Sequence, residues 1–141
     1  MSEIAPASEE RPARLDFPKR RIVRKRPEFD VVFDGGRRAS RPATLLLALE
    51  NGRGESRIGV SIARRYGTAP RRNRARRLVR ESFRLDRDRW PVGYDFVAVP
   101  RAGGFPDTLA EVRALLLELA PSAIEGPRQR PRPDRKRRKK R

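Results

Sequence analysis

Arginine is the most abundant functional side chain in one short stretch of this sequence. Between residues 64 and 84, nine arginines stand against a single acidic residue, Glu81. A guanidinium group is a planar, bidentate clamp for phosphate oxygens, so this density favours a polyanionic partner. The nine are Arg64, Arg65, Arg71, Arg72, Arg74, Arg76, Arg77, Arg80 and Arg84.

Several of these arginines recur at the helical repeat, since Arg72, Arg76 and Arg80 are each four residues apart. Like charges at that spacing repel one another, so a bare helix gains nothing from them. A phosphate partner explains the arrangement, because a rigid helix holds guanidinium groups at fixed intervals. A solvated charged face is the weaker alternative for so many like charges. Asn73, among them, either contacts a base edge or a 2′-hydroxyl or caps the backbone.

The 141 residues include no histidine and no cysteine, which removes most catalytic arrangements. Zinc fingers, thiol nucleophiles, disulfide frameworks and Ser-His-Asp triads all need one or the other. Asp86 and Asp88 form a candidate metal pair, but the flanking Arg84, Arg87 and Arg89 favour a neutralised helix end instead. The sequence therefore predicts a binding protein with no catalytic residue and no metal site of its own.

The formal net charge of +18 is distributed unevenly and suggests three parts. Residues 1–14 carry −1, residues 15–120 carry +11 and residues 121–141 carry +8. We predict a disordered N-terminal tail, a single folded domain and a disordered basic C-terminal tail with these boundaries, because both tails have too little apolar surface to offset the entropy of ordering. The C-terminal tail is either an arm that contacts nucleic acid or a solvated segment that adds only non-specific attraction.

The sequence gives no sign of a membrane or secretory destination. Residues 1–14 lack a basic start followed by an apolar run, so they do not form a secretory signal. No apolar stretch approaches the roughly 20 residues that span a bilayer. The arginine-rich stretch has an apolar stripe too narrow for a lipid-facing helix. We therefore expect a cytoplasmic protein with no membrane partner.

Three helices are predicted from local signals. The first covers Pro27–Phe33, with proline in its first turn and glycines 35 and 36 at its end. The second begins at Thr68 or Ala69 and runs to about residue 85. The third begins at Thr108, which forms a capping box with Glu111. The second helix has one buried stripe, formed by Ala75, Leu78, Val79, Ser82 and Phe83.

Strands are predicted at residues 44–49, 57–63 and 94–99, with residues 37–40 as a candidate edge strand. The first two of these strands are expected to form an antiparallel hairpin with a loop at residues 50–56. This order of elements predicts an α+β (α/β sandwich) fold, in which three helices cover a small mixed sheet of three to four strands.

The sequence resembles a known family. Arg72-Asn-Arg74, followed by Ala-Arg-Arg-Leu78 and Arg80-Glu-Ser-Phe83, is similar to the signature helix of the protein component of bacterial ribonuclease P. The resemblance extends over about residues 17 to 119. Its supporting segments are residues 28–33 with Gly36, residues 57–65 with Gly67 and Ala69, and residues 94–99 with Arg101.

The resemblance implies a small RNA-binding subunit of an enzyme whose catalytic RNA subunit removes 5′ leaders from precursor tRNA. The partners it implies are that RNA subunit, one protein per RNA, and precursor tRNA, with no small-molecule substrate. Mg²⁺ is expected with the RNA subunit and no cofactor in the protein. The implied fold is ribosomal protein S5 domain 2-like, with a left-handed βαβ crossover where general rules favour a right-handed one.

Two binding surfaces are implied by the resemblance. Aromatic rings in the leader-binding surface would stack on unpaired bases of any sequence. Core packing is the alternative role for Phe29 and Phe33. Contact with the RNA subunit is expected from Arg72, Asn73, Arg74, Arg76, Arg77 and Arg80. Contact with the precursor tRNA leader is expected from Phe29, Phe33, Arg64 and Arg65.

Two residues depart from the family pattern. Leu47 stands where the family often has an aromatic residue, and Pro70 where it usually has an aliphatic one.

Two other functions compete with that of a ribonuclease P subunit. A ribosomal-type structural RNA-binding protein without a processing role is the main alternative, and a DNA-compacting basic protein is the second. The standard DNA-binding modules are disfavoured, since the sequence shows no helix-turn-helix spacing, zinc ligands or zipper heptads.

Overall fold

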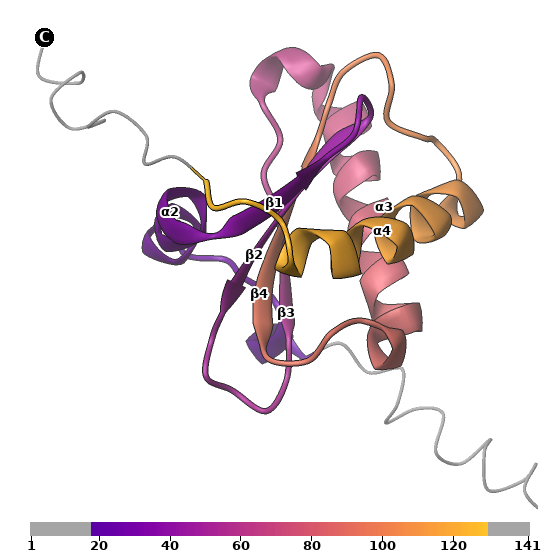
Figure 1. Cartoon of the computed structure of the whole chain (residues 1–141). Coiled ribbons are helices and arrows are strands. Elements are labelled where there is room, and N and C mark those ends of the chain that lie inside the picture. Colours follow the sequence, from indigo (N-terminus) through magenta and orange to yellow (C-terminus); the bar gives the residue numbers. More distant parts are fainter. Residues whose placement is uncertain (1–17, 130–141) are drawn as a thin grey trace, which may run out of the picture.

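The computed structural model describes residues 18–129, in which four strands form one mixed sheet in the order β1-β2-β4-β3 (Figure 1). β1 pairs with β2 and β2 with β4 in antiparallel register, whereas β3 and β4 run parallel. The predicted edge strand at residues 37–40 is therefore confirmed. The strands are β1 (Arg37–Ser40), β2 (Thr44–Glu50), β3 (Arg57–Val60) and β4 (Tyr94–Pro100).

The helices begin where the sequence places their caps. The Thr68 hydroxyl accepts a hydrogen bond from the Arg71 amide at 3.4 Å, and Pro70 occupies the first turn, where a missing N–H costs nothing. The Thr108 hydroxyl accepts from the Glu111 amide at 3.3 Å. The helices are α2 (Arg26–Gly35), α3 (Ala69–Asp86) and α4 (Leu109–Ile124), with short 3-10 turns η1 (Lys19–Arg21), η2 (Arg64–Tyr66) and η3 (Arg87–Arg89).

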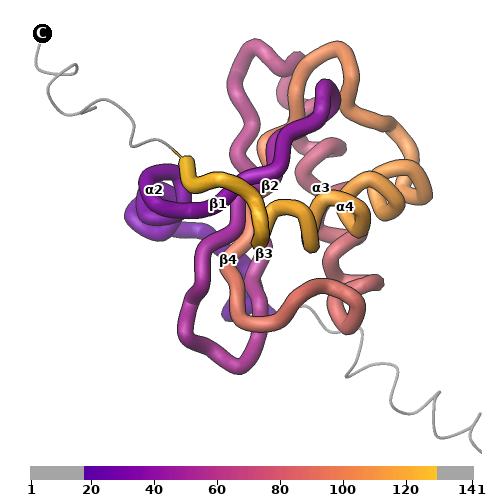
Figure 2. The backbone as a smooth tube through the Cα atoms, viewed as in Figure 1, coloured from indigo at the N-terminus to yellow at the C-terminus, as the bar shows by residue number. Residues whose placement is uncertain are grey.

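The two faces of the sheet are covered unequally (Figure 2). Because side chains alternate along a strand, Leu46 and Ala48 of β2 join the large core under α3 and α4, and Leu47 points the other way. The large core includes Trp90, whose ring meets those of Phe83 and Phe96 edge-to-face at centroid distances of 5.0 and 4.9 Å. Among residues 18–129, α2 is the helix that packs on the opposite face, and Val23, just before it, is buried there as well.

The predicted hairpin of the second and third strands is wrong. β4 lies between β2 and β3 and pairs with both of them. Four consecutive residues of β4, Asp95 to Ala98, are buried, so both faces of this strand are covered. α3 connects the parallel strands β3 and β4, so these three elements form the βαβ unit that the resemblance implied.

Ordered structure extends beyond residue 120, where the sequence predicts the start of the C-terminal tail. α4 continues through Pro121 to Ile124, because Ala120 and Ala123 are buried on its inner face. The chain then runs along the free edge of β1, where the Arg38 amide donates to the Pro127 carbonyl at 3.0 Å. The predicted tail at residues 1–14 and the remainder of the other, residues 130–141, lie outside the described residues.

Candidate nucleic-acid interface

A cavity of about 460 Å³ lies between α2, the chain after β3 and the arginine-rich helix α3. Two aromatic rings form part of its wall, and arginines from two separate segments stand around it. An aromatic surface bordered by guanidinium groups suits a single nucleic-acid strand, since bases stack on the rings and phosphates meet the charges. We call this cavity the cleft; it is lined by Arg24, Arg26, Phe29, Asp30, Phe33, Val60, Ser61, Ile62 and Arg76.

Phe29 and Phe33 serve both the core and the cleft. Each is partly buried and packs against the small cluster of Val32, Leu47 and Val97, and each also lines the cleft. The two interpretations of this pair, core packing and base stacking, are therefore compatible. The aromatic spacing of four residues on α2 brings both rings to the same wall.

The sheet makes room for the Phe29 ring through a glycine that the sequence interpretation overlooked. A Cβ at Gly59 would lie 3.0 Å from two ring atoms of Phe29 and 2.8 Å from the Cβ of Val23. No larger residue fits without displacing the ring. Gly59 on β3 is thus part of what shapes the cleft.

Leu47 is fully buried beneath α2, against Val32 and Val97. It does not line the cleft and offers no surface for stacking. In this chain the aromatic wall comes from α2, and the departure from the family pattern at Leu47 serves core packing.

α3 presents its arginines to solvent because its apolar stripe, which includes Val79 and Phe83, faces the sheet. Two of the predicted contact residues are held by hydrogen bonds within the protein. Arg72 donates to the Gly67 carbonyl at 2.7 Å. Arg74 donates to the carboxylate and the carbonyl of Asp107, at 2.6 and 2.7 Å. These bonds fix the two guanidinium groups at the start of the helix.

The other four predicted residues of α3 differ in environment. Asn73 and Arg77 are exposed, and Arg76 donates to the Asn73 side-chain oxygen at 3.1 Å. Arg80 is half-buried. Burial together with the positive charges of Arg76 and Arg24 lowers the pKa of Arg80 below its ordinary value.

The structure groups the predicted site residues differently from the sequence interpretation. Arg76 lines the cleft, although it was expected on the other surface. Arg64 and Arg65 lie on η2 with exposed side chains, and neither lines the cleft. Arg65 instead borders a second cavity of about 250 Å³, together with Val99 and Arg101.

Arg24 and Arg26 are cleft residues that the sequence interpretation missed. The signal was present, because the segment from Lys19 to Arg26 is strongly basic and immediately precedes the aromatic pair. Only the fold shows that this segment and α3 meet across the cleft.

A buried ionic network fixes the start of α2, and therefore the cleft wall, on the sheet. Arg57 donates to the two carboxylate oxygens of Asp95 at 2.8 and 2.6 Å and to Glu28 at 3.2 Å. Asn51 donates to Asp95 at 2.9 Å, and Glu28 accepts from the Arg24 and Lys25 amides at 3.3 Å each. Glu28 thus joins the first turn of α2 to β3, and Asp95 joins β3 to β4.

The pKa values of these carboxyl groups reflect the network. Burial alone would raise the pKa of Asp95, but hydrogen bonds from Arg57 and Asn51 outweigh it and hold the pKa below its ordinary value. The pKa of Glu28 is also below its ordinary value, although burial alone would raise it. The amides of Lys25 and Arg24 and the Arg57 guanidinium lower the pKa there.

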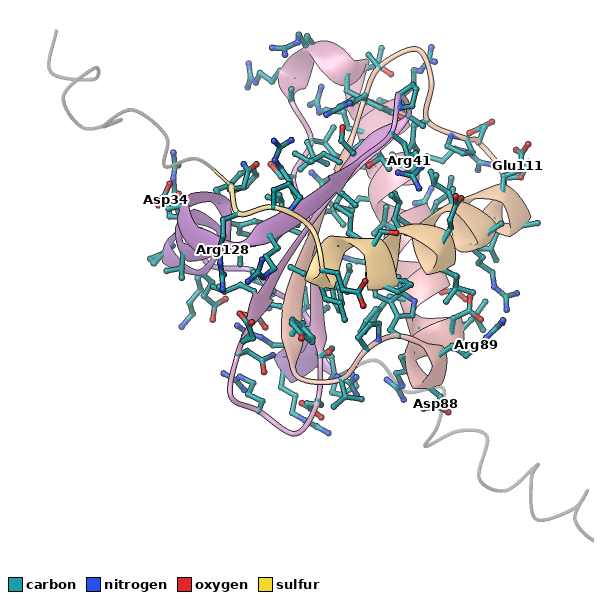
Figure 3. All side chains as sticks on the ribbon, in the orientation of Figure 1. Asp34, Arg41, Asp88, Arg89, Glu111 and Arg128 are labelled. Atoms are coloured by element: carbon teal, nitrogen blue, oxygen red, sulfur yellow. The ribbon has the colours of Figure 1, made fainter. Side chains whose placement is uncertain are left out.

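Asp86 is held within the fold by arginine. Its buried carboxylate accepts two hydrogen bonds from Arg113 of α4, at 2.9 and 2.7 Å. Asp88 is exposed, and Figure 3 shows it with Arg89 at the end of α3, pointing away from the core. Residues 18–129 contain no cluster of three or more Asp, Glu, His or Cys that could hold a metal ion.

The sequence model of the family described as Ribonuclease P matches residues 17–120. The chain belongs to the ribonuclease P protein family. It is 40% identical over 90 residues to the ribonuclease P protein component of Desulfotalea psychrophila, covering 64% of this chain and 75% of that one. To that of Thermotoga maritima it is 36% identical over 85 residues, covering 60% and 73%.

Solved structures of ribonuclease P proteins share the fold. The Thermotoga maritima protein superimposes with a TM-score of 0.62 at 32% identity, over 68% of this chain and 91% of that one. The Staphylococcus aureus protein has a TM-score of 0.65 at 19% identity, over 73% and 94%, and supports the fold alone. The α+β architecture with a mixed sheet is therefore that of bacterial ribonuclease P proteins.

Membership of this family assigns the chain a subunit role in the ribonuclease P holoenzyme, the endoribonuclease of tRNA 5′ processing, in partnership with its RNA subunit. The alternative of a ribosomal-type RNA-binding protein without a processing role is not favoured. The basic, aromatic-lined cleft agrees with a ribonuclease P protein that binds RNA.

Proposed function

We propose that this ribonuclease P protein binds the 5′ leader of precursor tRNA in the cleft and the RNA subunit through the exposed face of α3. The observation that carries the proposal is the cleft itself, about 460 Å³ in volume, which is lined by Phe29, Phe33 and Arg76. A leader differs in sequence from one precursor to the next. Stacking and phosphate contact suit such a substrate because neither depends on base identity.

The α3 surface is suited to a structured RNA with a fixed phosphate geometry. Arg72 and Arg74 are held in place by hydrogen bonds before any RNA arrives, so little side-chain entropy is lost on binding. Asn73 and Arg77 are exposed on the same helix and remain accessible. We assign contact with the RNA subunit to these four residues first; the family resemblance implies the same role for Arg76 and Arg80 on the same helix.

In this proposal the RNA subunit and its bound Mg²⁺ catalyse hydrolysis, and the protein binds the leader and the RNA subunit. One protein per RNA and a cytoplasmic location complete the proposal. Within the described range, no helix is long and apolar enough to cross a membrane.

The test is cleavage and binding by the holoenzyme reconstituted from the full chain and the RNA subunit. Added protein should restore cleavage of precursor tRNA at low Mg²⁺ and strengthen binding of precursors that have a leader over mature tRNA. Absence of both effects would refute the proposal. Equal affinity for duplex DNA and for the RNA subunit at one fixed salt concentration would instead favour a DNA-compacting protein.

A further inference from the structure

The chain after α4 extends along β1 to the end of α2. Figure 1 shows this segment, in yellow, passing from α4 over β1 towards α2. The Arg128 guanidinium donates a hydrogen bond at 2.8 Å to the carbonyl of Gly35, the last residue of α2. The Gln129 amide donates to the Gly36 carbonyl at 2.6 Å. We call residues 126–129 the C-terminal strap.

The last turn of α2 has no basic residue of its own. The last four carbonyl groups of a helix have no partner within it, and the C-terminus of a helix carries a partial negative charge. A basic side chain in the last turn offsets that charge, but the last turn of α2 contains the acidic Asp34 instead. Arg128 brings a guanidinium group to this place from 93 residues away in the sequence. The strap therefore caps the C-terminus of α2.

α2 depends on such tertiary contacts more than α3 and α4 do. It has ten residues, and isolated helices shorter than about 12–15 residues are marginally stable in water. α2 buries one residue, Val32, whereas α3 and α4 bury five each. The ion pair of Glu28 with Arg57 holds its first turn on the sheet. The strap supplies the corresponding contact at its last turn.

The strap is itself secured on the sheet. The Arg37 side chain of β1 donates to the Gly126 carbonyl at 3.0 Å, and Arg128 forms an ion pair with Glu50, at the end of β2, at 3.8 Å. Gly126 permits this close approach, because a Cβ there would collide with the Arg38 carbonyl. The strap therefore joins the sheet edge to the end of α2.

We propose that the C-terminal strap sets the position of the aromatic wall of the cleft by capping α2, with Arg128 as the positioning residue. Phe29 and Phe33, which form that wall, both lie on α2, and Phe33 lies in its last turn. A change at the end of the helix therefore reaches the wall. The inference rests on the proposed leader-binding role of the cleft. It assigns a role to residues beyond 17–120, the part of the chain that the family model matches.

The experiment uses the full chain, first alone and then in the reconstituted holoenzyme. Arg128→Gln removes the charge of the cap, Arg128→Lys keeps it, and Gly126→Ala disturbs the strap without changing any charge. Arg41→Gln is the matched control. Arg41 also donates to one carbonyl, that of Ser40, and pairs with one glutamate, Glu118, but it lies at the opposite end of β1 from α2 (Figure 3).

In the free protein, Arg128→Gln and Gly126→Ala should speed hydrogen exchange at the amides of α2 by about three- to fivefold, the contribution of a cation at a helix C-terminus, and leave α3 unchanged. In the holoenzyme, both variants should reduce the preference for leader-bearing precursor over mature tRNA by about threefold, because a leader binds only while the wall is in place. RNA-subunit affinity should stay within about twofold of wild type. Arg128→Lys should retain most of both properties, and Arg41→Gln should behave as wild type.

Two results would overturn the inference and leave the proposed function standing. In the first, exchange in α2 is unchanged, which shows that the strap does not hold the helix. A loss of affinity that accompanies this result in Arg128→Gln, with a smaller salt slope, would assign Arg128 to a direct phosphate contact. In the second, α2 exchanges faster but the preference for leader-bearing precursor is intact, which leaves the strap a purely structural role. If the wild-type holoenzyme shows no such preference, the proposed function fails, and exchange in the free protein still decides whether the strap caps α2.

Discussion

Replacing Asp95 with alanine should destabilise the fold more than any surface change, because it leaves Arg57 with only half of its partners. The Asp95 carboxylate accepts three hydrogen bonds, two from Arg57 and one from Asn51, and its side chain is 10% exposed. Removing one member of a buried ion pair typically costs about 3–5 kcal/mol, and the remaining contact of Arg57 with Glu28 puts Asp95→Ala near the lower limit, about 3 kcal/mol.

Urea unfolding at pH 7 measures this loss directly. Trp90 is the only tryptophan and is buried between Phe83 and Phe96, so its fluorescence reports the state of the main core. Glu118→Ala is the control, since its ion pair with Arg41 is exposed and should contribute less than about 1 kcal/mol. A loss below about 1 kcal/mol for Asp95→Ala would refute the view that this network fixes the sheet.

The same carboxylate predicts how stability depends on pH. The pKa of Asp95 is lowered in the folded state, so its ionised form stabilises the fold above its unfolded pKa of about 3.9. That stabilisation should be lost as the pH falls through the lower, folded pKa. Asp95→Asn should therefore flatten the fall in unfolding free energy below about pH 4, and an unchanged acid limb would contradict this assignment.

Two further predictions concern other parts of the molecule. Gly126→Ala should detach the segment after α4 from β1, because a Cβ there would lie 2.0 Å from the Arg38 carbonyl; faster hydrogen exchange at the Arg38 amide is the measurement, and unchanged protection would contradict it. Arg77→Ala should weaken RNA-subunit binding and reduce the slope of log affinity against log salt by roughly one, whereas an equal slope would exclude a phosphate contact at this exposed residue.

Local signals in the sequence were sufficient for the helices and for the identity of the strands. Thr68 and Thr108 each accept a hydrogen bond from an amide three residues away, and Pro70 suits the first turn because it has no N–H to satisfy, so these effects are visible in the sequence itself. Strand pairing is a different matter, because β2 and β3 are close in sequence and yet separated by β4. The pairing of β4 with both of them joins segments that are distant in the sequence, and no local signal specifies it.

The end of the domain shows a second limit of sequence reasoning. Charge and proline content after residue 120 predicted disorder, but small residues carried the structural information. Ala120 and Ala123 allow α4 to pack closely against the core, and Gly126 allows the chain to approach β1. As a result Arg128 lies against the end of α2, where it donates to the Gly35 carbonyl at 2.8 Å (Figure 3).

The grouping of the arginines was the least predictable feature, and it matters most for function. In the sequence, one helix holds most of them and suggests one surface. In the fold, the same helix divides them: Arg74 binds Asp107, Arg77 is exposed, and Arg76 lines the cleft, as does Arg24. Arg76 and Arg24 share the cleft with the aromatic pair of α2, whereas Arg74 lines a separate cavity with Tyr66 and Phe105. Charge that resembles a single RNA-binding stripe in the sequence is therefore divided between two surfaces, and variants on each surface can distinguish them.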